Sequence, residues 1–140
     1  ASAATPAPVP YAPSMPDMMN IGVQPRHSKL GLAGHARNWK YSAYELRELR
    51  TAFTRIARTA PAHDGWDTKA LFDAMIMAPL KDVDDAIKAA DGKAFDRTYA
   101  ALTGACNACH VTMGRDYIVI KVPRASGYPN QDFEPKKPAR

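Results

Sequence analysis

The chain has 140 residues, of which 46% are hydrophobic and 24% charged, a composition typical of one folded domain with its own core. No apolar run approaches the roughly 18 residues that a membrane span needs, and two cysteines three positions apart exclude a disulfide framework. The formal net charge is +5, but Lys and Arg are spread along the chain, so we expect no nucleic-acid partner and interpret the charge as a solvated surface or a docking surface for an acidic protein.

Both ends of the sequence are rich in proline. Residues 1–16 hold five prolines, which predicts an extended arm, and residues 123–140 predict an irregular tail. The sequence starts without Met and without a basic and apolar leader, from which we expect an exported chain whose signal peptide has been removed. Residues 17–122 between these ends are predicted to form one all-α domain.

Two helices are predicted in the first half of this domain. The first covers residues 17–38, with Pro25 suited to a first helical turn. A stripe at i, i+3, i+4 spacing on it comprises His27, Leu30, Gly31, Gly34 and His35. The second helix is expected to begin at Ser42, because Ser42 and Glu45 form a capping-box pattern, and to end before Pro61.

Two more helices are predicted in the second half. The third begins at Asp67 or Thr68, and Pro79 should kink it or divide it in two. The fourth covers residues 93–113, with Gly114 as its C-terminal cap. Four helices with short connections predict an antiparallel four-helix bundle, in which cofactors lie between facing helices. The apolar run 117–120 is expected to fold back as an extended strap, covering either a cofactor edge or a helix end.

The fourth predicted helix carries the sequence Cys106-Asn-Ala-Cys109-His110, which is the C-x-x-C-H motif of covalent haem attachment. Positions i, i+3 and i+4 share a helix face, so both thiols reach one porphyrin edge while the imidazole reaches the iron. We predict one covalent haem c, bound by Cys106 and Cys109, with His110 as proximal iron ligand. A redox dithiol and a zinc site are weaker alternatives, because no strand precedes the pair and only two cysteines are present.

A C-x-x-C-H motif on the last helix of a bundle resembles the class II c-type cytochromes, the group of cytochrome c′ and cytochrome c556. The resemblance covers about residues 17–116 and implies a haem whose distal face lies against the first helix. It also implies a homodimer through the first two helices as one oligomeric state. The chain is similar to a less familiar exported subfamily as well, through Arg26-His27-Ser-Lys29-Leu30, Ala36-Arg37-Asn38-Trp39 and Asn130-Gln131-Asp132-Phe133.

The resemblance places the sixth iron ligand on the first helix, where the candidates are His27, His35, Met18 and Met19. We prefer His27, because Gly31 and Gly34 follow it on the same face and would leave room for a flat porphyrin. An ordinary histidine without a ligand role is the open alternative. Arg26 and Arg37, with Lys29 beside them, are the candidate partners of the haem propionates, since Arg pairs well with carboxylates.

Four other side chains are assigned by their positions. His63, in the turn before Gly65, is expected to be exposed to solvent. Met75 and Met77 are expected to fill the core, and Met113 is placed beside a haem edge.

These features together predict a periplasmic electron carrier, not an enzyme, that exchanges single electrons with a redox protein. Two alternatives stay open. One is a five-coordinate haem protein that binds NO or CO on an open distal face. The other is a small peroxidase, which needs an unligated distal acid or base such as His27 or His35.

Overall fold

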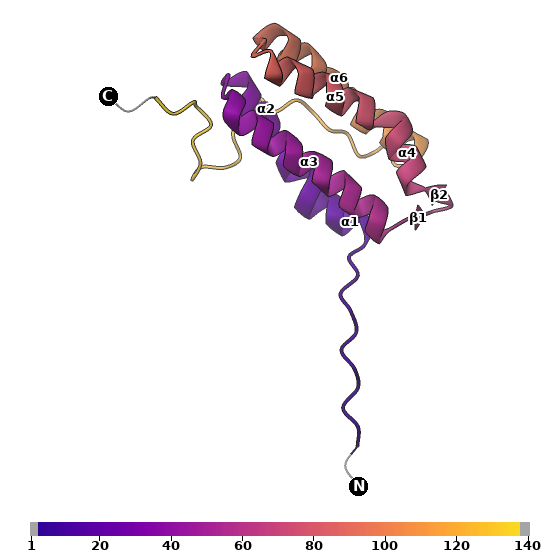
Figure 1. Ribbon diagram of the computed structural model, residues 1–140. Coiled ribbons are helices and arrows are strands. Elements are labelled where there is room, and N and C mark those ends of the chain that lie inside the picture. The colour runs from indigo at the N-terminus through magenta and orange to yellow at the C-terminus, as the bar shows by residue number, and fades with distance from the viewer. Residues whose placement is uncertain (1–2, 138–140) are drawn as a thin grey trace.

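The computed structural model describes residues 3–137 and is mostly helical, with one short antiparallel sheet (Figure 1). The predicted all-α class is confirmed in this coarse form. The elements are α1 (Met15–Met18), the π-helical turn η1 (Met19–Val23), α2 (Gln24–His35), α3 (Trp39–Thr59), β1 (Ala62–His63), β2 (Trp66–Asp67), α4 (Thr68–Met75), α5 (Met77–Lys88) and α6 (Gly92–Thr112). Within the described residues, no helix is both long and apolar enough to span a bilayer.

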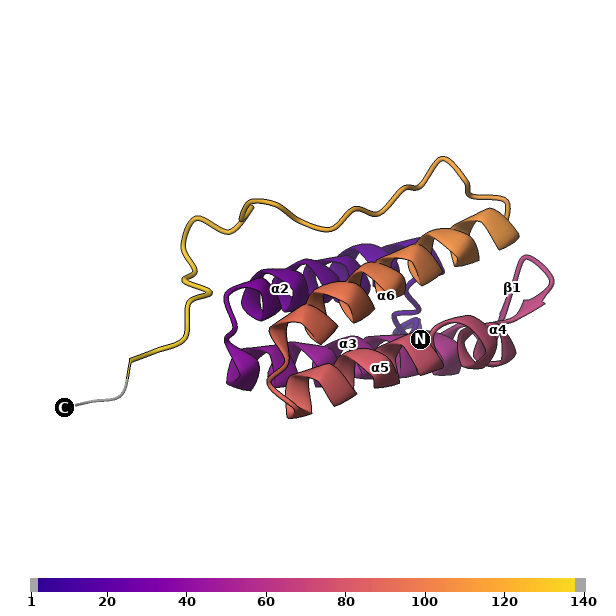
Figure 2. The same cartoon turned by 90° about the horizontal axis from the view of Figure 1, so that it is seen from above.

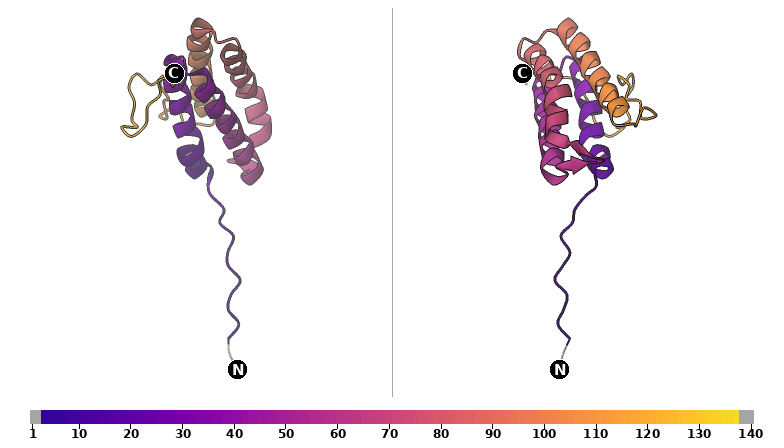
Figure 3. Two further views of the ribbon diagram at one scale, coloured as in Figure 1. Left: turned by 60° about the vertical axis from the view of Figure 1, so that its left-hand side comes forward. Right: turned by 90° about the vertical axis from the view of Figure 1, so that its right-hand side faces the viewer.

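The long helices pack in pairs around one core. Helix α2 packs on α3 and α5 packs on α6, while α3 also contacts α5 and α2 contacts α6 (Figures 2 and 3). Their buried faces supply the largest fully buried apolar side chains, which include Leu30, Leu49, Ile56, Leu80, Phe95 and Leu102. Since each helix buries one stripe against its neighbours, helix packing provides most of the apolar burial.

The first helical segment begins at Met15, inside the region predicted to be an extended arm over residues 1–16. Ser14 caps it, because its Oγ accepts a hydrogen bond from the Asp17 amide at 3.2 Å. Pro16 lies in the first turn of this helix. Backbone N–H groups there have no acceptor within the helix, so the N–H that proline lacks costs no helical hydrogen bond. Residues 3–13 have no regular secondary structure and leave the helices as an extended arm (Figure 1).

The second predicted helix begins earlier than expected, and the capping box at Ser42 is wrong. Helix α3 starts at Trp39, with Asn38 as its N-cap. Ser42 lies within the first turns, where its hydroxyl donates to the Asn38 carbonyl at 2.7 Å. Glu45 is fully buried and accepts a hydrogen bond from Arg26 at 2.7 Å instead of capping the helix.

The third predicted helix is divided, as expected from its proline. Asp67 caps α4 by accepting a hydrogen bond from the Ala70 amide at 3.0 Å. The break falls at Ile76, because Pro79 has no N–H to donate to the Met75 carbonyl. The predicted third helix is therefore two separate helices, α4 and α5.

Helix α6 ends as predicted, at a glycine in a left-handed conformation. Gly114 has φ +72°, its N–H donates to the Val111 carbonyl, and the Arg115 N–H donates to the His110 carbonyl at 2.7 Å. This Schellman motif reverses the chain at the end of the helix. The residues that follow run back over α6 and α2 without regular secondary structure (Figure 2).

Candidate functional site

A cavity of about 320 Å³ lies between the C-terminal half of α6, the α1–η1–α2 segment and the chain after α6. Cys106, Cys109 and His110 all line it. Much of the remaining wall is apolar and includes Met15, Val23, Phe53, Phe72, Ile76 and Ile120. The volume lies within the range of about 300–1,000 Å³ that is usual for ligand and cofactor sites. All three reactive residues of the motif therefore face one ligand-sized space.

The two cysteines are free thiols, Cys109 buried and Cys106 half-buried. Burial, with a smaller contribution from the neighbouring Cys109, raises the pKa of Cys106 to about 11. Burial also raises the pKa of Cys109. A redox dithiol needs a lowered pKa to supply a thiolate at neutral pH, so the environment of this pair does not suit that alternative.

His110 has its two ring nitrogens in different surroundings. Its Nδ1 lies 3.2 Å from the carbonyl oxygen of Ile118, on the chain after α6. An imidazole protonated at Nδ1 donates this hydrogen bond and keeps the Nε2 lone pair for a metal. Burial lowers the pKa of His110, and the bond to Ile118 opposes it more weakly, so the neutral, metal-binding form is favoured.

The wall opposite the motif is one stripe of the first helical segment. Met15, Met19, Val23 and His27 recur every four residues along it and all line the cavity. Two of the other candidate ligands, Met18 and His35, do not line the cavity. Met18 is buried in the core. His35 has its Nδ1 2.6 Å from the Gly31 carbonyl of its own helix.

His27 is at the cavity wall, but both of its ring nitrogens face hydroxyl groups of α6. Its Nε2 lies 2.8 Å from Thr103 Oγ1, and its Nδ1 lies 3.2 Å from the Tyr99 hydroxyl. The imidazole also stacks on the Tyr99 ring, with the centroids 4.8 Å apart. Burial lowers the pKa of His27 to about 4. Binding a metal through Nε2 would require this nitrogen to give up Thr103.

Gly31 and Gly34 do make room for flat groups, but these are side chains of α6. A Cβ on Gly31 would overlap the Tyr99 ring, and a Cβ on Gly34 would overlap the Phe95 ring. The expectation that these glycines leave space for a porphyrin is therefore wrong. Their role is to let α2 approach the two stacked aromatic rings closely.

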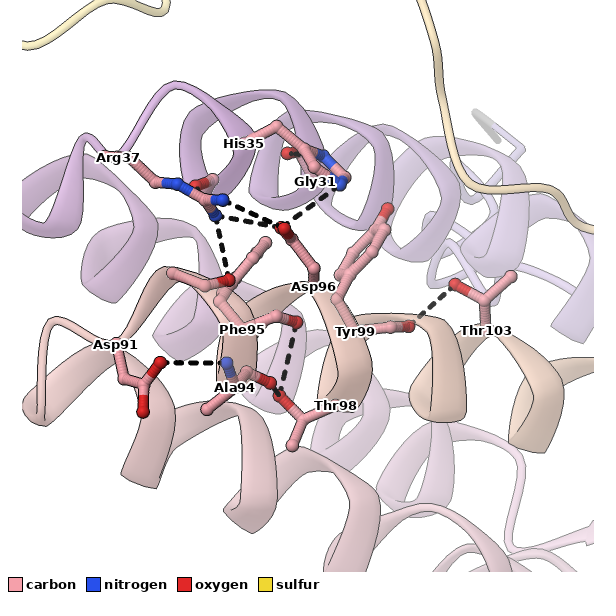
Figure 4. A network of polar contacts seen from close by, with 12 residues as sticks. Gly31, His35, Arg37, Asp91, Ala94, Phe95, Asp96, Thr98, Tyr99 and Thr103 are labelled. Carbon is pink, nitrogen blue, oxygen red and sulfur yellow. Dashed lines mark hydrogen bonds and ion pairs between the residues drawn. The ribbon is translucent and has the colours of Figure 1, made fainter.

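Arg26 and Arg37, predicted as propionate partners, do not line the cavity. Arg26 pairs with the buried Glu45 of α3 at 2.7 Å. Both terminal nitrogens of Arg37 bond to the Asp96 carboxylate, at 2.8 and 2.9 Å, near the start of α6 (Figure 4). Both guanidinium groups are thus used to join α2 to its neighbouring helices.

The basic side chain that does line the cavity is Arg115, which the sequence argument missed. It follows the Gly114 cap directly, and the chain reversal there brings it back beside His110. Arg115 also pairs with Asp64 in the loop between β1 and β2, at 2.5 Å. Its place after a glycine cap was the available signal, since a Schellman motif returns the next residue to the end of the helix.

Several other side chains can now be placed. His63, expected to be exposed, is half-buried and lines the cavity. Met113 also lines it. Met75 and Met77 pack against the core. Ile118 and Ile120 line the cavity, so the extended strap lies beside the motif.

Comparison with known proteins identifies no relative of this chain: no protein-family model, no curated protein and no solved structure matches it. Within residues 3–137, no group of three or more His, Cys, Asp or Glu side chains is placed to hold a metal ion.

Proposed function

We propose that this chain is a monohaem c-type cytochrome that works as an electron carrier. The observation that carries the proposal is the cavity itself, because both thiols and the imidazole of a C-x-x-C-H motif line one apolar space of ligand size. The bond from His110 Nδ1 to the Ile118 carbonyl adds support, since it leaves Nε2 as the metal-binding nitrogen.

The chain's own residues have separate tasks in this proposal. Cys106 and Cys109 hold the haem through thioether bonds, and His110 is the proximal ligand. Arg115 replaces Arg26 and Arg37 as the propionate partner, because it is the arginine at the cavity. Bound haem supplies a one-electron ferric/ferrous couple, and the apolar wall keeps water away from it.

We further propose that the helices form an antiparallel four-helix bundle of the class II cytochrome type. The pairing of α2 with α3 and of α5 with α6 supports this arrangement. A bundle suits a carrier because its packed helices hold ligands in one geometry during oxidation and reduction. Export to the periplasm and docking to an acidic redox protein belong to the same proposal. The basic net charge of +5 supports the docking.

One observation favours a second candidate function, the binding of NO or CO. The hydroxyl groups of Thr103 and Tyr99 lie 2.8 and 3.2 Å from the two ring nitrogens of His27, the preferred sixth ligand. If His27 keeps these partners, the first helical segment offers the iron only the thioethers of Met15 and Met19 as ligands of a usual kind at the cavity. An iron without a sixth protein ligand has an open face for a small gas.

The experiment is expression of the chain in a host that attaches haem c, followed by haem staining after denaturing electrophoresis. Wild type should retain haem through denaturation, and Cys106→Ala/Cys109→Ala should lose it completely, because the bond is covalent. Gly104→Ala is the matched control on α6, since a Cβ there meets no atom within 4 Å. Wild-type protein without covalent haem would contradict the proposal.

Spin state then separates the two candidate functions. A low-spin ferric signal in electron paramagnetic resonance, together with a ferrous absorption spectrum that CO leaves unchanged, supports the carrier. A high-spin signal and a CO-dependent absorption shift support gas binding. The variants His27→Ala and Met19→Ala identify the sixth ligand, because only loss of the true ligand converts low spin to high spin.

A further inference from the structure

Asn107, the first residue between the two cysteines, makes a two-point contact with the chain that follows α6. Its Nδ2 donates to the Ile120 carbonyl at 2.9 Å, and its Oδ1 accepts from the Ile120 N–H at 2.7 Å. An amide side chain that bonds both backbone groups of one residue acts as a neighbouring β-strand would. Asn107 therefore determines both the position and the orientation of Ile120.

Ile120 belongs to residues 115–122, which we call the strap. Two residues before it, the Ile118 carbonyl accepts from Nδ1 of His110. Two residues of extended chain span at most about 7 Å, so fixing Ile120 restricts where the Ile118 carbonyl can lie. The Ile118 N–H also donates to the Arg115 carbonyl at 2.9 Å, which restricts the strap from its other end.

Apolar burial alone does not hold the middle of the strap in place. Tyr117 is 74% exposed, Val119 is 66% exposed and Ile118 is 41% exposed. Both hydrogen bonds of the Asn107 side chain act on the same residue, Ile120, so they restrain it together. Val122 packs against the core at the far end of the strap. Between Arg115 and Val122, these two bonds fix the strap at Ile120, beside the motif.

We infer that Asn107 is a positioning residue: it holds the strap so that the Ile118 carbonyl orients His110 and the strap closes one wall of the cavity. The inference rests on the proposed haem site. A hydrogen bond at Nδ1 raises the electron-donating strength of the imidazole toward iron, which favours the ferric state. Loss of this bond should therefore raise the reduction potential.

The test compares haem-loaded wild type with Asn107→Ala and with Asn107→Ala/Ala108→Asn. The double variant keeps the amide but moves it to the exposed neighbouring position of the motif, so that composition is unchanged. In both variants, faster exchange of the Ile120 amide and of the His110 Nδ1 proton should be seen by NMR. The ferric-to-ferrous equilibrium should shift up to tenfold toward ferrous, which is about 59 mV for one electron.

Three results would overturn the inference. An unchanged Ile120 amide in Asn107→Ala would show that Asn107 does not hold the strap. Faster exchange of the Ile120 amide, with the exchange rate of the His110 Nδ1 proton and the reduction potential both unchanged, would show that Asn107 holds the strap but does not influence the ligand. Absence of covalent haem from wild type would remove the proposed function and the inference together, and it is seen before any variant is made.

Asn107→Asp provides a second variant if Asn107→Ala does not fold. Its carboxylate can still accept from the Ile120 N–H but cannot donate to the Ile120 carbonyl. Ile120 exchange faster than in wild type supports the two-point contact, because one of its two hydrogen bonds is lost. Exchange equal to wild type contradicts it.

Discussion

Helices α2 and α6 meet in two different ways along their length. Around Gly31 and Gly34 they are closely packed. The rings of Tyr99 and Phe95 fill the positions that a Cβ atom on these two residues would need. Toward Cys109 the same two helices border a cavity of about 320 Å³. Close packing at one end holds the helices in place, so that the other end can stay open to a cofactor without loss of the fold.

His27 lies at the boundary between the packed end and the open end. It stacks on Tyr99 on one side and lines the cavity on the other. Changes at the packed end or between α2 and α3 should therefore alter stability and leave the absorption spectrum unchanged. Changes at the open end should alter the absorption spectrum or the reduction potential and have little effect on stability.

The largest stability effect is expected from Arg26→Ala. It leaves the Glu45 carboxylate, which is fully buried, without its charged partner. Breaking such a pair costs about 3–5 kcal/mol of unfolding free energy, and the lower end applies because Arg26 is partly exposed. Urea unfolding measures this change. The paired control, Arg26→Met with Glu45→Leu, should recover most of the lost unfolding free energy. An altered haem spectrum in Arg26→Ala would contradict the expectation that changes between α2 and α3 affect stability alone.

The next effect is a loss of stability in acid due to His27. Its pKa in the folded chain is about 4, below the unfolded value of 6.5, so the unfolded chain binds more protons between these values. Stability is therefore complete above pH 6.5 and falls as the pH approaches 4, by a total of about 3 kcal/mol. Urea unfolding across this range should show the slope in wild type and a weaker slope in His27→Gln.

The same experiment also tests whether His27 is an iron ligand. A His27 that keeps Thr103 and Tyr99 as partners titrates without a change in spin state. If the spectrum of His27→Gln differs from that of wild type at neutral pH, the histidine binds iron and belongs to the open end.

A smaller effect is expected from Gly34→Ala at the packed end. The added Cβ would overlap the Phe95 ring, and overpacking of this kind costs about 1–3 kcal/mol. Gly104→Ala on α6 is the matched control, because its Cβ meets open space. It should stabilise the chain by about 0.5–1 kcal/mol through helix propensity. Equal unfolding midpoints for the two variants would contradict close packing at Gly34.

The smallest stability effect is expected from Arg115→Gln at the open end. Its ion pair with Asp64 is exposed, and such pairs contribute about 0–1 kcal/mol. Asp64→Asn breaks the same pair from its other side and should match it in urea unfolding. Only Arg115→Gln should also shift the reduction potential, because Arg115 alone of the two lines the cavity. Equal potentials in both variants would remove Arg115 as a propionate partner.

Local signals in the sequence predicted those parts of the fold that depend on neighbouring residues. The Gly114 cap and the division of the third helix near Pro79 were predicted correctly, because backbone geometry at glycine and proline is an intrinsic property. The capping box at Ser42 failed because Asn38 caps the helix one turn earlier and its carbonyl already accepts from the Ser42 N–H. Glu45 then pairs with the distant Arg26.

Residue types that suit two kinds of partner could not be placed from the sequence. A glycine stripe is compatible with a porphyrin or with aromatic rings of another helix, and sequence spacing does not distinguish them. An arginine pairs with a propionate or with Asp96 or Glu45, and the choice depends on which one lies within reach. His63 reached the cavity because the β1–β2 turn folds toward it, which no local pattern indicates.

The sequence by itself determined most of the helical segments, the Gly114 cap and the motif at Cys106, Cys109 and His110, since these follow from spacing and backbone chemistry over a few residues. Only the tertiary structure decided which side chains surround that motif. It placed Arg115, Asn107 and the Ile118 carbonyl there and sent Arg26 and Arg37 elsewhere. The physical reason is that a polar group takes the best partner within reach, and reach is set by helix packing between distant parts of the chain.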